Sequence, residues 1–509
     1  MRFTLDEILT GIHSTDKHDS HHQSASSRKP LRIITDSREA GPATIFWALR
    51  GDKHDGHRFV ESALSDGADA AVVESGAIRS THRAGSFSTE PAVEEGYLSD
   101  SRSVPSIIEV ADTLSALQSL AAWNVTRHAK PVIGITGSYG KTTTREMVHA
   151  ALQHKLNPHC SPRNFNNQFG VPLTLLGLNA RHDAAIVELG ASAHGEIARL
   201  CEIAAPEIGI ITGIGQAHRG TFGDCSQVAI AKGELAAALP ADGVLLLCGD
   251  DSYSRTIATR AACRVRLIGT GHECHVRSET IRQDGEFLAV RIDGVDFRVR
   301  TAGKHFARSV LFAVAAGREC GLRDKQIARG LADFRTPAGR CSVETIGEWT
   351  VIDDSYNASP ETFEAACGLL GNWPDATRRL LICGDMLELG DAAAALHQDA
   401  GLAAARAGVD RIYACGQFAG ALTGAAIEAG LDPDCCEAFQ ELPSLLHRLQ
   451  QTMRSGDVLL MKGSRGMQME RVIEWLRREV LSGEPENRQR RQPQLTLPLS
   501  QTADTESAQ

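Results

Sequence analysis

The sequence predicts a chain of three α/β domains. Its 509 residues correspond to about three domains at the usual size of roughly 150 residues each. Short apolar runs recur along the chain, and each is followed by a turn with Gly or Asp and then by a segment of helical length. Apolar runs without polar alternation, separated by helices, are typical of parallel strands covered on both faces. The repeated order of strand, turn and helix therefore predicts parallel sheets flanked by helices.

Four parts of the chain are predicted from these runs and from shifts in composition. In the first part, LRIITDSR, TIFWAL and the segment from Asp55 to Glu74 indicate strand, strand, helix and strand. Polar stretches at 14–29 and 76–104 interrupt this pattern and are expected to be solvated insertions. The segment RTPAGRC at 335–341 is expected to separate the second and third domains. The predicted parts are a first domain over 1–105, a second over 106–336, a third over 337–480 and a disordered tail over 481–509.

Seven apolar runs in the second and third domains are predicted to be parallel strands. They are VIGIT (132–136), AAIVEL (184–189), EIGIIT (207–212), TVIDD (350–354), RLLICGD (379–385), RIYACG (411–416) and DVLLMKG (457–463). In an open parallel sheet, ligands bind beyond the carboxyl ends of the strands. The residues that directly follow these runs are therefore the first candidates for a functional site.

The composition excludes several classes of protein. Lys and Arg number 53 against 63 Asp and Glu, a net charge of −10, so the chain is a poor candidate for a nucleic-acid-binding protein, which needs a basic face. No apolar run reaches the roughly 18 residues of a membrane helix, and the N-terminus lacks the apolar core of a signal peptide. The 13 cysteines are expected to be reduced, buried thiols. A cytoplasmic protein with no membrane insertion and no nucleic-acid partner is expected.

The segment GITGSYGKTTTREM follows a predicted strand and is typical of a loop that binds nucleotide phosphates. Gly137 and Gly140 allow backbone amides to approach phosphate oxygens, and Lys141 adds a compact positive charge. Thr142 is placed to offer its hydroxyl to Mg²⁺. The spacing departs from the strict pattern, because Ile135 stands where the first glycine is usual. The residues predicted to hold the phosphates are Gly137, Ser138, Gly140, Lys141, Thr142 and Thr143.

Two candidate metal ligands follow neighbouring strands. Glu188 ends one apolar run, and His218 follows the next run along the chain. At one edge of a sheet, these side chains and Thr142 could complete a Mg²⁺ shell. Mg²⁺ prefers oxygen ligands, so His218 taken alone is more typical of a hydrogen-bonded loop histidine. Lys232, further along, is by itself typical of a solvated surface charge.

Nine ordered segments carry a family resemblance. They are TDSR (35–38), DGHRF (55–59), TGSYGKTTT (136–144), NFNNQFGVPLTLL (164–176), VELGASAHGEI (187–197), AKGEL (231–235), DDSYNASP (353–360), GDMLELG (384–390) and KGSRGMQME (462–470). Together they resemble the Mur ligases, the ATP-dependent amide-bond-forming enzymes of peptidoglycan precursor synthesis. Several are most similar to members that add D-alanyl-D-alanine to UDP-N-acetylmuramoyl-tripeptide. The resemblance covers residues 31–480 apart from the insertion at 76–104.

The resemblance implies the three-domain Mur ligase architecture. This consists of an N-terminal UDP-sugar-binding α/β domain, a central P-loop ATPase domain with a parallel sheet, and a C-terminal Rossmann-like domain. It further implies a monomer that uses ATP and Mg²⁺. In the implied reaction, ATP phosphorylates the terminal carboxylate of the tripeptide, and the amine of the dipeptide then attacks the acyl phosphate.

The resemblance also implies a role for each matching residue. Those near the UDP-sugar are Ser37, Arg38, Asp55 and His57, and those toward the muramoyl-peptide are Asn164, Asn166 and Asn167. Lys232 matches a lysine that is carbamylated in relatives, which would make it a carboxylate-like metal ligand beside Thr142, Glu188 and His218. In the third domain, Arg340, Asp354, Tyr356 and Asn357 would serve the nucleotide, and Lys462, Ser464 and Arg465 the dipeptide. The residues implied in catalysis are Lys141, His218, Lys232 and Arg340.

Four positions depart from the family pattern. Tyr139 stands where the phosphate loop of relatives has Asn, and Phe306 and Ser309 replace two further asparagines. One of those asparagines serves the adenine in relatives, so the adenine contact of this chain stays open. Phe306 is equally typical of a residue that stacks on the base and of a core residue. Gln168 replaces a Glu.

Other functions compete with this interpretation. A sister ligase for diaminopimelate is disfavoured because its DNPR-like motif is absent, although the third residue of the acceptor peptide stays open. A folylpolyglutamate synthetase would lack the UDP-binding first domain. A nucleotide-binding relative without ligase activity fits the departures at Tyr139, Phe306 and Ser309. Four residues argue against it, namely Lys141, Glu188, His218 and Lys232. No guanine-specificity or switch motif indicates a GTPase or motor.

Overall fold

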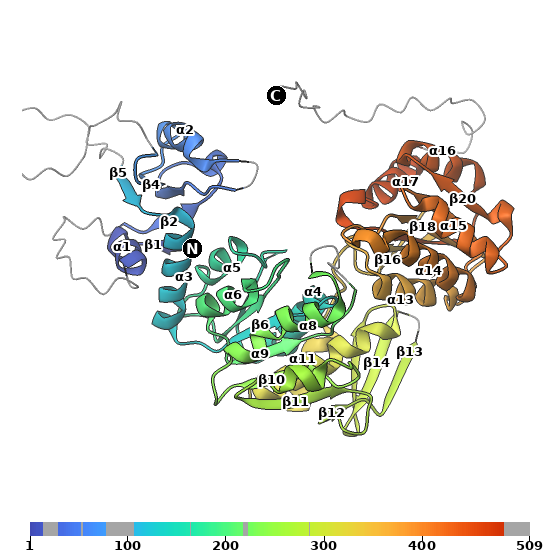
Figure 1. Ribbon diagram of the computed structural model, residues 1–509, viewed down its shortest axis with the longest axis horizontal. Helices are drawn as coiled ribbons and strands as arrows, with labels where there is room; N and C mark the ends of the chain where they lie inside the picture. The colour runs from blue at the N-terminus through green and yellow to red at the C-terminus, as the bar shows by residue number, and fades with distance from the viewer. Residues whose placement is uncertain are drawn as a thin grey trace, which may run out of the picture.

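The computed structural model describes residues 1–13, 29–51, 54–77, 106–162, 164–216, 222–284 and 286–482. The predicted insertions at 14–29 and 76–104 and the predicted tail at 481–509 lie almost wholly outside the described residues. His218 lies outside them as well. The rest of the chain forms three domains in an open arc, with the second domain in the middle (Figure 1).

The first domain is a five-stranded sheet in the order β1-β2-β3-β4-β5. Only β1 is antiparallel to its neighbour. The elements are β1 (Arg2–Phe3), α1 (Leu5–His13), β2 (Leu31–Ile34), β3 (Thr44–Trp47), α2 (Val60–Ser65), β4 (Ala70–Glu74) and β5 (Ser106–Val110), with the short 3-10 helices η1 (Ser37–Glu39) and η2 (Gly56–Phe59). The predicted order of strand, strand, helix and strand is present from β2 to β4. Because β5 pairs with β4, the first sheet extends beyond the boundary predicted at residue 105.

Helix α3 (Thr113–His128) joins the first domain to the second. Asp112 caps its start, since the carboxylate accepts the N–H of Ser115. On the first-domain side, the buried indole of Trp47 donates a hydrogen bond to the Thr113 carbonyl at 2.7 Å. Leu117 and Leu120 belong to a hydrophobic cluster that contains residues of both domains. The helix therefore anchors the first domain through a shared core.

The second domain contains a parallel seven-stranded sheet in the order β12-β11-β10-β9-β6-β8-β7. Its strands are β6 (Val132–Thr136), β7 (Pro158–Cys160), β8 (Ala184–Glu188), β9 (Ile208–Ile211), β10 (Val244–Cys248), β11 (Arg264–Gly269) and β12 (Val276–Arg277). Its helices are α4 (Lys141–Gln153), α5 (Gly170–Leu175), α6 (Glu196–Ala204), α8 (Cys225–Lys232), α9 (Glu234–Ala238), α10 (Ser254–Ala258), α11 (Ala307–Glu319) and α12 (Asp324–Ala332). An additional antiparallel sheet, which the sequence interpretation did not include, comprises β13 (Thr280–Asp284), β14 (Phe287–Ile292) and β15 (Val295–Arg300).

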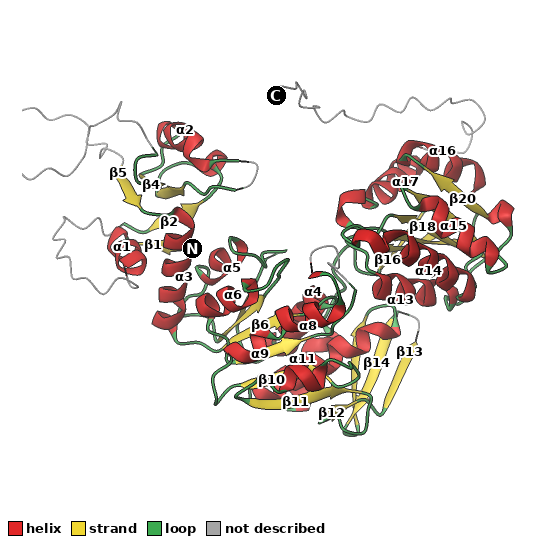
Figure 2. Ribbon diagram, viewed as in Figure 1, coloured by secondary structure: helices red, strands yellow, loops and turns green. Residues whose placement is uncertain are grey.

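The third domain is a six-stranded sheet in the order β16-β17-β21-β18-β19-β20, with helices on both faces (Figure 2). Only β16 is antiparallel to its neighbour. The strands are β16 (Ser342–Ile346), β17 (Trp349–Asp354), β18 (Arg378–Gly384), β19 (Arg411–Cys415), β20 (Cys436–Phe439) and β21 (Asp457–Lys462). The helices are α13 (Pro360–Gly371), α14 (Ala393–Arg406), α15 (Ala419–Glu428), α16 (Leu442–Thr452) and α17 (Glu470–Ser482). All seven strands predicted in the second and third domains are present.

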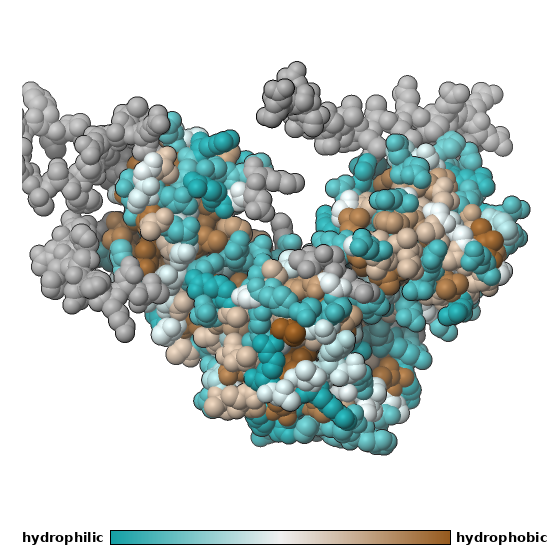
Figure 3. All heavy atoms as spheres, in the orientation of Figure 1, coloured by the Kyte–Doolittle hydropathy of each residue, from teal (hydrophilic) through white to brown (hydrophobic). Residues whose placement is uncertain are grey.

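The surface of the described residues is mixed in character. On the face drawn in Figure 3, hydrophobic residues form small groups among hydrophilic ones. Among the described helices, none combines the length and the apolar composition that crossing a membrane requires.

Candidate active site

A cavity of about 930 Å³ is lined by residues of the second and third domains. It opens at the carboxyl ends of β6 and β8, where the sequence predicted a functional site. Most of the predicted site residues line it: Ser138, Gly140, Lys141, Thr142, Thr143, Asn164, Asn166, Asn167, Glu188, Arg340, Asp354, Tyr356, Asn357, Lys462, Ser464 and Arg465. One cavity therefore receives residues that are far apart in the sequence.

The phosphate loop runs from the end of β6 to the start of α4. Gly137 has a φ of +140°, and a Cβ there would lie 2.1 Å from the hydroxyl oxygen of Thr212. Gly140, with a φ of +75°, caps the start of α4. Only glycine suits this backbone, which turns the helix N-terminus toward the cavity. The ammonium of Lys141 donates to the Gly137 carbonyl at 2.6 Å, and burial lowers the pKa of this lysine.

Glu188 is the centre of a buried polar cluster beside the loop. Its side chain is 3% exposed. One carboxylate oxygen accepts the Thr142 hydroxyl at 2.8 Å, and the other accepts the Asn166 amide at 3.0 Å. Arg145, which the sequence interpretation missed, lies 3.4 Å from the same carboxylate. Its position one helical turn after Lys141 was the available signal, because both then lie on one face of α4.

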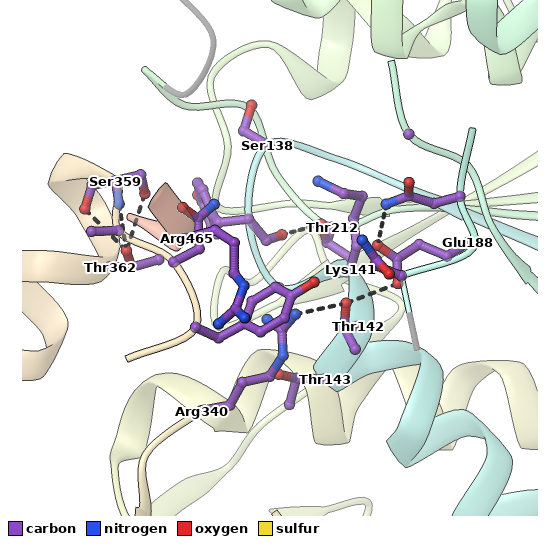
Figure 4. A pocket seen from close by; sticks show the side chains of 18 of the residues that line it. Ser138, Lys141, Thr142, Thr143, Glu188, Thr212, Arg340, Ser359, Thr362 and Arg465 are labelled. Carbon is purple, nitrogen blue, oxygen red and sulfur yellow. Dashed lines mark hydrogen bonds between the residues drawn. The ribbon is translucent and has the colours of Figure 1, made fainter. Parts of the chain in front are cut away.

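Arg340 reaches the phosphate loop from the segment that enters the third domain. Its guanidinium donates to the Thr142 hydroxyl at 3.0 Å (Figure 4). The guanidinium also stacks over the ring of Tyr356, at 4.3 Å from the centroid. Thr142 therefore donates to Glu188 and accepts from Arg340, so one hydroxyl connects the buried carboxylate to the third domain.

Lys462 is 1% exposed and lies at the end of β21. Its ammonium is 2.5 Å from the Asp354 carboxylate and donates to the Asn357 carbonyl at 3.1 Å. Strands β17 and β21 are neighbours in the sheet, which brings the two charges together. The pair holds the segment that carries Tyr356 at the cavity. In this structure the ammonium of Lys462 is thus engaged by the protein itself.

Ser464 connects its own turn, which was expected to face the dipeptide, to the turn at 384–390. Its N–H donates to the Asp385 carbonyl at 3.0 Å, and its hydroxyl accepts the Leu387 N–H at 2.8 Å. Next to it, the Arg465 guanidinium pairs with Glu470 at 2.6 Å. The turn at 384–390 and the turn at 463–466 therefore form one surface of the cavity.

Lys232 is buried, unlike a typical surface lysine of a helix. It is 1% exposed, and its ammonium donates to the Ala191 carbonyl at 3.0 Å. Burial, reinforced by the charge of Lys141, lowers its pKa to about 7. A neutral amine is the form that reacts with carbon dioxide, so this environment suits carbamylation. Lys232 does not line the cavity itself, although Ala191 does.

The four residues predicted for the UDP-sugar lie in the first domain and do not line this cavity. The Arg38 side chain is 87% exposed and pairs with Asp36. The ring of His57 accepts the Glu74 N–H through Nε2 at 3.0 Å, so its Nδ1 carries the proton and donates to Asp55 at 2.7 Å. This hydrogen bond lowers the pKa of Asp55. His57 and Asp55 thus fasten η2 to the end of β4.

Among the described residues, no three His, Cys, Asp or Glu side chains gather in a way that could hold a metal ion. Of the residues predicted to hold Mg²⁺, His218 lies outside the described residues, and Glu188 provides a buried carboxylate at the cavity. The Thr142 hydroxyl beside the carboxylate supplies a further oxygen, which Mg²⁺ prefers. Thr142 and Glu188 thus provide oxygen ligands of the kind that Mg²⁺ prefers.

The fold and the cavity define a class of protein: a three-domain α/β nucleotide-binding enzyme whose site is completed by its third domain. Three family models match consecutive parts of the chain. They are the Mur ligase family catalytic domain at 32–123, the Mur ligase middle domain at 135–317, and the Mur ligase glutamate ligase domain at 339–465. The chain belongs to the Mur ligase family.

Relatives match almost the whole length of the chain. The UDP-N-acetylmuramoyl-tripeptide–D-alanyl-D-alanine ligase of Bacillus subtilis is 32% identical over 459 residues, which are 88% of this chain and 94% of that protein. The enzyme of the same name from Escherichia coli is 31% identical over 450 residues, 87% of this chain and 92% of that protein. A crystal structure of MurF from Acinetobacter baumannii superposes with a TM-score of 0.78 at 28% identity, covering 94% of this chain and 99% of that one.

Proposed function

We propose that this chain is an ATP-dependent ligase that joins D-alanyl-D-alanine to UDP-N-acetylmuramoyl-tripeptide. The observation that carries the proposal is the match to several enzymes of this name over nearly their full length. The cavity supports it, because the phosphate loop, a buried carboxylate and an arginine of the third domain meet there. The products are the UDP-linked pentapeptide, ADP and phosphate.

The chain's own residues meet the physical demands of this reaction. A carboxylate does not react with an amine until it is activated, and here ATP transfers phosphate to it. Lys141 and the start of α4 bind the phosphates, and Arg340 neutralises charge that develops on them. Asn166 and Asn167 position the peptide beside Glu188. The acyl phosphate hydrolyses in water, so the third domain excludes solvent while the dipeptide binds.

Mg²⁺ would be held by Thr142 and Glu188, with His218 and carbamylated Lys232 as further ligands. The cation supplies charge neutralisation for the phosphate oxygens. The buried Lys232, with its pKa of about 7, supports this assignment because it is available as a neutral amine. We also assign a cytoplasmic location, since the reaction consumes ATP, and a monomeric state, which the resemblance to the family implies.

The first test is phosphate release from ATP by the purified chain with UDP-N-acetylmuramoyl-tripeptide, with D-alanyl-D-alanine added or omitted. Release that needs both substrates, together with a pentapeptide product in the mass spectrum, is the expected result. Release with a different amino acid would instead assign the chain to a sister ligase. Absence of release with every acceptor, despite ATP binding, would identify a nucleotide-binding relative without ligase activity.

A further inference from the structure

The family resemblance leads us to expect asparagine at three positions near the phosphate loop where this chain has Tyr139, Phe306 and Ser309, and the structure shows how two of these residues pack. Ser309 is buried, and its hydroxyl lies 3.0 Å from that of Thr144 in α4. Phe306 is 6% exposed and belongs to the hydrophobic core, with its ring against that of His305. Both residues line the cavity, but Phe306 has no hydrogen-bonding group and the Ser309 hydroxyl already pairs with Thr144, so neither reproduces the paired donor and acceptor of an amide. The other residues that line the cavity are therefore the candidates for a contact with the base.

The third departure, Tyr139, forms a pair with Arg308 of α11. The guanidinium donates to the Tyr139 hydroxyl at 2.9 Å, and its carbon lies 5.4 Å from the ring centroid. Both residues line the cavity. Among the described residues Arg308 forms no ion pair with a carboxylate, so further N–H groups remain for a ligand. Burial raises the pKa of Tyr139, so its hydroxyl stays protonated.

The loop after β9 is shaped to receive the tyrosine ring. A Cβ on Gly213 would lie 2.8 Å from the Tyr139 hydroxyl oxygen, and one on Gly215 would lie 2.8 Å from Cε1 of the ring. Such distances are too short for any side chain, so glycine at both positions makes room for the ring. Tyr139 therefore has a defined position against this loop.

The order of strands places this pair on the side of the phosphate loop away from Glu188. Strand β6, which precedes the loop, lies between β8 and β9. On the β8 side, the Asn166 amide donates to Glu188. The terminal phosphate of a nucleotide would meet the metal and the peptide carboxylate there. The β9 side carries Tyr139 and Arg308 against Gly213. A nucleotide with its reacting phosphate at Glu188 extends its base toward the β9 side.

We infer that Tyr139 and Arg308 form the platform on which the purine base of ATP rests in this chain. Aromatic rings and guanidinium groups both stack on bases, and the free N–H groups of Arg308 can donate to ring nitrogens. This inference rests on the ATP-dependent activity proposed above and assigns the base contact that the missing asparagines left open.

Calorimetric titration of the full-length protein with Mg²⁺-ADP and, separately, with inorganic tripolyphosphate tests the inference. The second probe carries phosphates and no base. For Tyr139→Ala, loss of a stacking contact is expected to weaken ADP binding by about 10- to 100-fold and to leave tripolyphosphate binding unchanged. Tyr139→Phe keeps the ring and is expected to stay within about threefold of the wild type. Arg308→Met should weaken ADP binding and leave tripolyphosphate binding unchanged. Arg266→Met, in β11 of the same domain and not among the residues that line the cavity, is the matched control.

Two outcomes would overturn the inference. Unchanged ADP affinity in Tyr139→Ala would show that the base lies elsewhere. Equal losses for ADP and tripolyphosphate would show that the variant distorts the phosphate loop. Neither probe needs the peptide substrates, so a wild-type protein that binds ADP and forms no pentapeptide would refute the proposed ligase activity and leave this inference intact.

Discussion

Arg340 of the segment that enters the third domain donates a hydrogen bond to the hydroxyl of Thr142, the second residue of α4, at 3.0 Å. These residues lie far apart in the sequence and on different domains. The guanidinium carbon of Arg340 lies over the Tyr356 ring, 4.3 Å from the ring centroid. The bond therefore makes the nucleotide site dependent on the position of the third domain.

The first prediction concerns Arg340. In Arg340→Met the site loses the positive charge that closes over the phosphates, so kcat is expected to fall by roughly 100-fold. Binding of ADP should weaken far less, since the phosphate loop stays intact. Steady-state kinetics and ADP titration measure both quantities, and Arg335→Met, at the same domain boundary, is the control. A normal kcat would contradict the role of Arg340.

A second prediction concerns Glu188. Replacement by Gln keeps the shape of the side chain and removes the charge that a cation needs, so kcat is expected to fall by roughly 100- to 1,000-fold. The Mg²⁺ concentration for half-maximal activity should rise. Activity measured against Mg²⁺ concentration checks this, with Glu202→Gln on the exposed face of α6 as the control. An unchanged Mg²⁺ dependence would remove Glu188 from the metal site.

Much of the fold and of the site was predictable from the sequence. The strands of the second and third domains are continuous apolar runs, because both faces of a parallel sheet are buried. The phosphate loop was predictable because its glycines, lysine and threonines all lie within the short segment GSYGKTTT. The hairpin of β14 and β15 was missed although it has a local signal. Phe287–Ile292 alternates between buried and half-buried residues, and Asp293-Gly294 forms the turn with positive φ at both positions.

Other features had no local signal. The ion pair of Lys462 and Asp354 depends on β17 and β21 being neighbours in the sheet, although more than a hundred residues separate them. The burial of Lys232 likewise depends on how α8 packs against the loop that contains Ala191. Strand order and helix packing arise from the whole fold, so periodicity alone does not give them.

The third prediction follows from the pKa of Lys232, lowered from 10.5 to about 7. Between these values the unfolded chain binds more protons than the folded one, so the stability of the wild type rises with pH across this window. The cost of burying the lysine is therefore largest below pH 7 and fades toward pH 10.5. Lys232→Met removes this cost and is expected to raise Tm by about 3 °C or more at pH 6, with loss of ligase activity.

Thermal melts of wild type and Lys232→Met between pH 6 and pH 9, in buffers free of carbon dioxide so that Lys232 stays an amine, check this prediction. The difference in Tm should narrow as the pH rises, because the wild-type lysine then becomes neutral. Lys155→Met, at an exposed position, is the control. A variant that melts below the wild type at pH 6 would show that the lysine contributes more by its contacts than its burial costs.

The fourth prediction concerns His397, whose ring is hydrogen-bonded to the turn at 384–390. It is 1% exposed, and its Nε2 accepts the Met386 N–H at 2.9 Å, so Nδ1 carries the proton and donates to the Ala393 carbonyl at 2.7 Å. Burial lowers the pKa of His397, which keeps the ring neutral and Nε2 free to accept. The ring also stacks on Phe418 at 4.7 Å.

In His397→Ala the Met386 N–H is left buried without its acceptor, which costs about 1–3 kcal/mol. The turn that presents Leu387 to the cavity should loosen, so KM for D-alanyl-D-alanine is expected to rise by roughly tenfold with KM for ATP unchanged. His397→Gln keeps an acceptor and should recover part of the loss. Steady-state kinetics with each substrate varied measures both constants. The contacts of His397 with Ala393 and Phe418 lie within the third domain, so its loss could also disturb that domain as a whole. An equal rise in both KM values would indicate such a general disturbance. His397 would then have no specific role in positioning the turn.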